Sequence, residues 1–298
     1  MTIRYKALIA ITAIIISACQ NTKNPSPAQE ELSTRTLTEE FKAYWYNGQA
    51  EITSYNLEQE RYGEIREAEA VLIFVTEDFL PEIQVKADHS SDTNQSVLKL
   101  NKTKKFFTGI YPYSIMTSVF YPLQEKNHAL KVSTSVQEWC GQVYAQLNNR
   151  KSFEIKSHSY FESEADQVFD FQKTHLEDEL WTQLRVNPAE LPSGEIQMIP
   201  SFEFIRLRHQ ELKPYKAIAT TETIDALHVF RVEFPELNRS LSIWFEPAFP
   251  YKILKWEEQI GELRTKATYK KQLKTNYWSK NKNQDSHLRD SLQLKNSL

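Results

Sequence analysis

Hydrophobic and polar residues alternate along most of the chain between residues 49 and 278. A period of two predicts β-strands that turn one face toward a core. Residues 263–270 show the pattern most clearly, whereas the run 71–75 is almost continuously apolar and predicts a strand buried on both faces. Further strands are predicted at 97–100, 106–107, 139–147, 153–161, 196–199, 202–207, 215–219, 227–234, 241–245 and 253–256.

Two short helices are predicted to interrupt the strands. The first lies between Thr38, a favourable N-cap, and Gly48, which ends it. The second begins with the capping-box pattern Thr174-x-x-Glu177 and ends at Asn187, which precedes a proline.

Polar segments at 101–104 and 148–151 separate apolar runs and are predicted to be hairpin turns. Many short strands and two helices define a mainly β fold. We expect an antiparallel barrel or a curled half-barrel with two short helices, because curling removes exposed strand edges.

The first nineteen residues resemble a bacterial lipoprotein signal. Arg4 and Lys6 precede an apolar run, 7–16, which ends in Ile-Ser-Ala-Cys at Cys19. This run is shorter than the roughly 20 residues that span a bilayer. We expect residues 1–18 to be removed and Cys19 to carry palmitate-type acyl chains that anchor the protein in the cell envelope, at the outer membrane.

The mature chain is predicted to have three parts: a flexible tether at 19–36, a β-rich domain at 37–278 and a polar C-terminal tail at 279–298. The formal net charge is −3, yet residues 262–298 hold nine basic and three acidic residues. This basic end is either a solvated face or a surface oriented toward anionic groups. No stripe of arginines with interleaved aromatics is present, so no nucleic-acid partner is expected.

Composition excludes several enzyme classes. Only 6 glycines occur, widely spaced, so phosphate-cradling loops and the G-x-S-x-G nucleophile elbow are absent. The 7 histidines are also scattered, with no short-range zinc motif among them. No cofactor is therefore predicted.

Cys140 is the single cysteine left after lipidation of Cys19. Counting outward from the 148–151 turn places residue 140 opposite residue 159, beside His158. Cys140 is therefore a candidate nucleophile with His158 as its base. The alternative is a buried structural cysteine.

Three carboxylates, Glu162, Glu164 and Asp166, alternate along the sequence. On a strand they would share one face, where a calcium ion could bind. A solvated acidic surface explains the same spacing.

Aromatic residues gather in two segments, 106–121 and 244–256. In a barrel they either line a cavity for a lipid or sugar or fill the core. The ligand-binding candidates among them are Phe106, Tyr111, Tyr113, Trp244 and Trp256.

The lipobox, the segment 133–141 (STSVQEWCG) and the segment 243–247 (IWFEP) resemble a family of uncharacterised predicted lipoproteins of Bacteroidota. Some of its members carry the label "septum formation inhibitor Maf". The phosphate-binding Ser-x-Ser-Pro-Arg-Arg-type loop of the Maf pyrophosphatases is absent here, so that activity is not implied. The chain is also similar, at the level of fold, to periplasmic β-barrel domains that bind or carry hydrophobic groups.

These features favour a non-catalytic, lipid-anchored envelope protein that binds an apolar or amphiphilic ligand or an envelope partner. Two alternatives stay open. One is a hydrolase that uses Cys140 or the Glu162/Glu164/Asp166 cluster, and the other is a purely structural surface lipoprotein.

Overall fold

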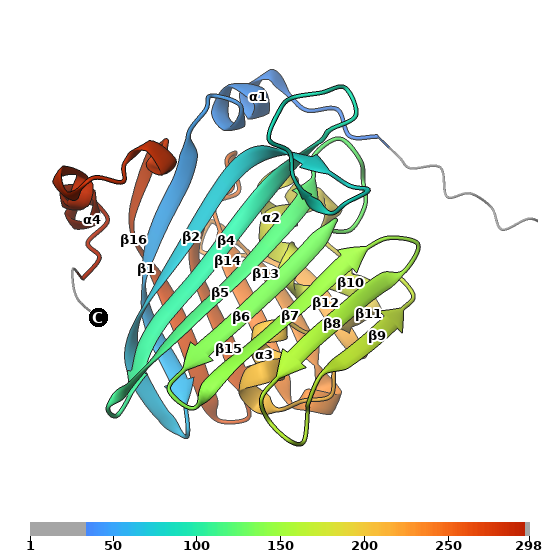
Figure 1. Cartoon of the computed structure of the whole chain (residues 1–298), viewed down its shortest axis with the longest axis vertical. Helices are drawn as coiled ribbons and strands as arrows, with labels where there is room; N and C mark the ends of the chain where they lie inside the picture. Colours follow the sequence, from blue (N-terminus) through green and yellow to red (C-terminus); the bar gives the residue numbers. More distant parts are fainter. Residues whose placement is uncertain (1–33, 296–298) are drawn as a thin grey trace, which may run out of the picture. The chain divides into compact units, whose positions relative to one another are not determined.

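A computed structural model describes residues 34–295, which lie within one compact unit, Ser33–Leu298. Its main feature is a 16-stranded sheet in which almost every strand pairs with its neighbours in sequence (Figure 1). The ladders are antiparallel except for the short parallel pair β10–β11. The strands are β1 (Ala50–Arg61), β2 (Glu64–Leu80), β3 (Val85–Lys86), β4 (Gln95–Thr108), β5 (Tyr111–Pro122), β6 (Lys131–Glu138), β7 (Gly141–Asn149), β8 (Phe153–Ser159), β9 (Gln167–Phe171), β10 (His175–Leu176), β11 (Gly194–Ile199), β12 (Tyr215–Ile224), β13 (Leu227–Phe234), β14 (Arg239–Phe245), β15 (Ile253–Ile260) and β16 (Leu263–Thr275).

The sheet curls but does not close. Strand β1 pairs with β16, so the two ends of the domain lie side by side, blue beside red in Figure 1. The two edges of the sheet are β9 and β10, which are joined by residues 172–174. The prediction of a mainly β, curled half-barrel is therefore confirmed.

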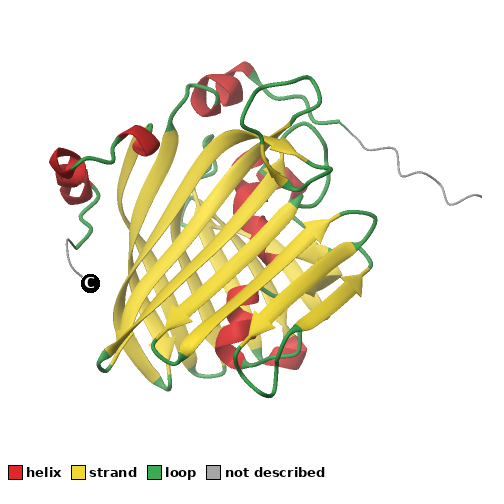
Figure 2. Cartoon of the chain, viewed as in Figure 1, coloured by secondary structure: helices red, strands yellow, loops and turns green. Residues whose placement is uncertain are grey.

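Four α-helices accompany the described strands: α1 (Glu39–Trp45), α2 (Leu180–Val186), α3 (Phe202–Arg208) and α4 (His287–Ser291). Helices α2 and α3 lie inside the curl, between the green strands in front and the orange strands behind (Figures 1 and 2). Trp181 of α2 packs against Trp256, and the Trp256 ring also packs against Tyr55 of β1. The inner face of the sheet and these two helices thus share one hydrophobic core.

Local signals explain α1 and the end of α2. The Thr38 hydroxyl accepts a hydrogen bond from the backbone N–H of Phe41, as expected of an N-cap. The chain leaves α2 at Asn187, as predicted. The predicted Thr174–Glu177 capping box does not form, since the Thr174 hydroxyl donates to the Gln197 carbonyl. Instead, the Glu179 carboxylate in the 3₁₀ turn η1 (Glu177–Glu179) accepts a hydrogen bond from the Leu176 N–H.

Segment 202–207 was predicted to be a strand and is the helix α3. The hydrophobic pattern did not distinguish a helix from a strand here. Helix α3 is enclosed by the sheet, so the polar residues Glu203 and Arg206 are buried along with the apolar side chains. The signal for a helix was local: the Ser201 hydroxyl accepts a hydrogen bond from the Phe204 N–H and caps the first turn.

The predicted turn at 101–104 is also wrong, because β4 runs without interruption from Gln95 to Thr108. Lys102 and Lys104 are buried within this strand and both reach Glu203 of α3. A hairpin turn does join β7 and β8, but it occupies residues 150–152 and so begins two residues later than the predicted 148–151.

The C-terminal segment packs on the outer face of the sheet. Leu292 is buried against Ala50, Ile52 and Val75, and the Ser54 hydroxyl donates to the Leu292 carbonyl at 2.5 Å. The segment predicted to be a polar tail therefore has two apolar contacts with the sheet, the buried Leu292 and the partly buried Leu294. Among residues 34–295, no helix has both the length and the apolar character needed to cross a bilayer.

Candidate functional site

A groove of about 360 Å³ separates α3 from the inner face of strands β6–β9. Its strand wall follows from the period of two, which turns Thr134 and Val136 of β6, and then Val143 and Ala145 of β7, toward the same side. The remaining lining residues are Ser157, Ser163, Glu164, Gln167, Phe169, Phe202, Ile205, Arg206, His209, Gln210, Glu211 and Leu212.

Arg206 is the buried charge of the groove. Its side chain is only 5% exposed, and its guanidinium stacks over the Phe161 ring at 4.2 Å. Its nearest carboxylate, Glu138, lies 3.8 Å away, and its Nε has no hydrogen-bond partner in the described part of the chain. Burial lowers the pKa of Arg206, although an arginine stays cationic at any physiological pH. The groove thus holds a partly compensated positive charge with an unused donor.

His209 stands at the end of α3, where a left-handed backbone (φ 50°) turns the chain out of the helix. Its Nδ1 lies 2.6 Å from Oε1 of Glu164, and the Ser159 hydroxyl donates to the other oxygen of that carboxylate at 2.6 Å. Its Nε2 faces Nη1 of Arg206 at 3.5 Å. Within residues 34–295, no serine, threonine or cysteine side chain hydrogen-bonds to this imidazole. The geometry suits binding of a ligand.

Sequence reasoning missed Arg206 and His209 because it assigned their segment to a strand. The Ser201 cap was the signal available, since a helix beginning there brings Arg206 and His209, three residues apart, onto neighbouring positions of one face.

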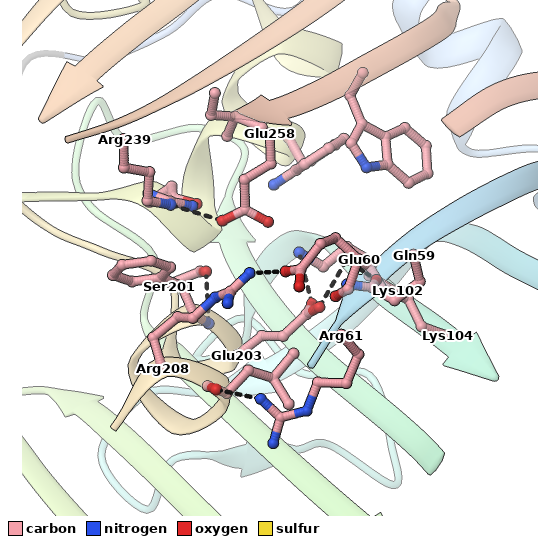
Figure 3. Close-up of a pocket in the computed structure, with 16 residues that line it drawn as sticks. Gln59, Glu60, Arg61, Lys102, Lys104, Ser201, Glu203, Arg208, Arg239 and Glu258 are labelled. Carbon is pink, nitrogen blue, oxygen red and sulfur yellow. Dashed lines mark hydrogen bonds and ion pairs between the residues drawn. The ribbon is translucent and has the colours of Figure 1, made fainter. Parts of the chain in front are cut away.

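A second, much smaller cavity of about 30 Å³ lies within the ionic interior between α3 and strands β1, β4, β14 and β15 (Figure 3). Lys104 Nζ lies 2.6 Å from Glu203, and Arg208 pairs with Glu60. Arg239 makes two hydrogen bonds to Glu177, at 2.5 and 2.6 Å, and a third to Glu258.

This interior cluster is nearly balanced in charge and is not a ligand site. Five basic and four acidic side chains border it, and its volume accommodates a water molecule or two but no organic ligand. Its hydrogen bonds join α3 and η1 to the sheet, so its role is to hold the elements that form the groove.

Cys140 does not meet His158. The thiol is exposed in the turn between β6 and β7, outside the ladder in which Tyr144 lies opposite His158. The predicted register was therefore wrong, since the hairpin turn begins later than assumed. The hydrogen bond to Glu138 raises the pKa of the Cys140 thiol, and His158 lies 3.2 Å from Asp166 instead. An activated nucleophile needs a lowered pKa.

Glu162, Glu164 and Asp166 lie in the turn between β8 and β9, not on one face of a strand as predicted. The turn separates them: Glu164 reaches His209, Asp166 reaches His158, and Glu162 is exposed. Two of the three carboxylates are thus paired with histidines. The single carboxylate-lined strand face that was predicted as a possible calcium site does not form.

None of the five aromatic candidates lines the groove. Phe106 and Tyr113 stack in the core at 4.7 Å between ring centroids, and Tyr111 packs beside them. Trp256 is buried in the core and borders the small ionic cavity. Trp244 is partly exposed, with Lys255 Nζ 4.1 Å from its ring centroid. Cys19, the predicted lipidation site, lies outside the described residues.

No protein-family model matches the chain, and no curated protein matches its sequence. Among solved structures, the chain is similar to a β-barrel-like protein of a domain of unknown function, DUF1849, from Brucella abortus. The identity is 6% and the TM-score 0.42, with 76% of this chain and 96% of that chain covered.

Proposed function

We propose that this protein is a lipid-anchored envelope protein that binds an amphiphilic ligand, an apolar chain with one acidic group, in the groove beside α3. The observation that carries the proposal is Arg206, a buried arginine with an unpartnered Nε at the wall of a largely apolar groove. A buried polar donor without a partner costs about 1–3 kcal/mol, which a carboxylate or phosphate oxygen would recover.

The apolar side of the ligand would meet Val136, Val143, Ala145, Ile205 and Leu212. The volume of about 360 Å³ lies in the range of ~300–1,000 Å³ typical of small-molecule sites. Each buried CH₂ of the ligand contributes about 0.8 kcal/mol. The Glu164 carboxylate in the same groove is paired with His209, so its charge is partly compensated where the acidic group would approach Arg206.

The lipid anchor of the proposal rests on the signal pattern that ends at Cys19. Labelled palmitate incorporated by the wild type and lost in Cys19→Ala supports it, and label retained by Cys19→Ala overturns it. The hydrolase alternative gains no support from the thiol of Cys140 or from the dispersed carboxylates described above.

A photoreactive fatty acid that carries a diazirine on its chain tests the ligand class. It is added to membranes containing the full-length lipoprotein, and crosslinked peptides are mapped by mass spectrometry. We expect label on groove peptides of β6, β7 and α3. Ala145→Trp fills the groove and is expected to abolish this label, while Arg206→Gln reduces it at least fivefold.

Arg264→Gln is the matched control, because Arg264 is an exposed arginine on β16, away from the groove lining. It is expected to leave labelling unchanged. Label scattered over the surface, or label on the groove that survives Ala145→Trp in a folded protein, would overturn the proposed ligand site.

A further inference from the structure

Two histidines and a glutamate that are distant in sequence meet where β10 runs into η1. His128 comes from the segment between β5 and β6, His175 from β10 and Glu179 from η1. One potential ligand atom of each lies within 4.8 Å of those of the other two. None of the three lines the groove beside α3.

The Glu179 carboxylate is held in a defined orientation. Its side chain is 2% exposed, and its Oε2 accepts a hydrogen bond from the backbone N–H of Ala129 at 2.7 Å. Its Oε1 accepts from the N–H of Leu176 at 3.3 Å and lies 2.8 Å from Nδ1 of His128. Backbone donors of this kind are the outer contacts that orient metal-binding carboxylates.

The two imidazoles face the same carboxylate from different directions. Their ring centroids are 5.8 Å apart and their planes are inclined by 78°. Across residues 34–295, no hydrogen bond is made to the ring nitrogens of His175, although the residue is only partly exposed.

We propose that His128, His175 and Glu179 bind a divalent transition-metal ion of the zinc type. Two imidazole nitrogens and one carboxylate oxygen form a recurrent ligand set for zinc and its neighbours, whereas calcium and magnesium prefer oxygen alone. With metal–ligand bonds of ~2.0–2.2 Å, the ligand atoms of a tetrahedral site lie about 3.3–3.6 Å apart. The present separations run from 2.8 Å up to 4.8 Å, so each needs to change by about 1.5 Å at most, which side-chain rotation allows.

The ion would replace the proton shared by His128 and Glu179 and would bring the orphan ring of His175 into the same coordination shell. Three protein ligands would leave a fourth tetrahedral position for water or an external ligand. The site joins three chain segments near the edge of the sheet, so metal binding is expected to stabilise the fold by mass action.

The test uses the full-length lipoprotein in detergent, purified without a polyhistidine tag and stripped with a chelator. Co²⁺ is added while visible d–d absorption is recorded, and Zn²⁺ is added while the melting temperature and the heat of binding are measured. We expect one Co²⁺ per chain, its displacement by Zn²⁺ and a rise in melting temperature.

His175→Ala is the decisive variant, because the ring of His175 has no hydrogen bond to lose in the metal-free protein. Outer-shell partners alone are worth ~10–100-fold in affinity, and we expect loss of this ligand to weaken Zn²⁺ binding at least 100-fold. His158→Ala, which removes a more exposed histidine of β8, is expected to bind as the wild type does.

Glu179→Gln is a second test and needs a folding check, since Glu179 is buried. Absence of Co²⁺ absorption in the wild type, or equal Zn²⁺ affinity of wild type and His175→Ala, would overturn the site. Because no groove residue is involved, the fatty-acid crosslinking and the metal titration succeed or fail independently.

Discussion

Arg185 of α2 donates two hydrogen bonds to Glu51 of β1, at 2.6 and 2.7 Å, and both side chains are almost completely buried. Tyr44 donates to the same carboxylate, and the Nε of Arg185 donates to the carbonyl of Pro250 at 2.8 Å. The pair therefore joins an interior helix to the central strand of the curled sheet. Burying such an ion pair costs free energy, but removing one partner is strongly destabilising, because the other charge is then left buried without compensation.

Glu51→Gln is expected to lower the free energy of unfolding by about 3–5 kcal/mol, because it leaves the Arg185 charge buried without its counter-ion. Denaturant titration followed by circular dichroism measures the change. The exposed pair Lys42–Glu39 provides the control: Lys42→Ala should cost under about 1 kcal/mol. The double variant Glu51→Leu/Arg185→Met should recover much of the lost free energy of unfolding. A double variant less stable than Glu51→Gln would contradict this account.

Asp178 makes stability depend on pH. Burial raises the pKa of this carboxyl to about 6, and one of its oxygens has no hydrogen-bond partner in the described chain. In the unfolded chain its pKa is ~3.9. The folded state therefore holds the proton more tightly, and the contribution of Asp178 to stability is fully present below pH ~4 and is lost as pH rises through about 6.

Asp178→Asn is expected to remove this dependence while keeping an acceptor for the Phe202 N–H, which donates to Asp178 at 3.0 Å. At pH 7 the relative gain could reach about 3 kcal/mol, from a shift of about two units. Unfolding free energies measured between pH 4 and pH 7 should fall in the wild type and change less in the variant. Parallel curves would argue against a raised pKa.

Gly141 lies directly against the ring of Tyr160, where a side chain would begin. A Cβ added at this position would come within 2.5 Å of the ring. Gly141→Ala is therefore expected to destabilise by about 1–3 kcal/mol, the usual cost of overpacking. Tyr160→Ala should cancel most of this cost in the double variant, as read from melting temperatures. A double variant no more stable than Gly141→Ala would place the strain elsewhere.

Glu138 is expected to suppress the reactivity of Cys140. The hydrogen bond to its carboxylate raises the pKa of the exposed thiol, and the thiolate is the reactive form. Glu138→Gln should therefore speed iodoacetamide alkylation at pH 8 severalfold, followed by mass spectrometry. Glu162→Gln, a change at an exposed carboxylate, should leave the rate as it is. Equal rates in wild type and Glu138→Gln would show that the carboxylate does not control the thiol.

Local features of the sequence determined much of the fold. Alternation located most strands, because one face of each lies against the core, as in β5, where Tyr113, Ile115 and Val119 are buried in turn. The Thr38 cap located α1, since the hydroxyl and the N–H that it accepts lie within three residues. Such signals can be recognised from neighbouring residues alone, without information about distant segments.

Only the tertiary structure decided which polar residues are inside. The sequence around Lys104 predicts a turn. In the structure its Nζ lies 2.6 Å from the carboxylate of Glu203, a residue remote in sequence. Arg206 and His209 form a site only because α3 lies within the curl, and His128 meets His175 only because β10 ends the sheet there. The physical reason is common to all three. Each arrangement brings together segments that are remote in sequence, and the sequence near one of them carries no record of the other.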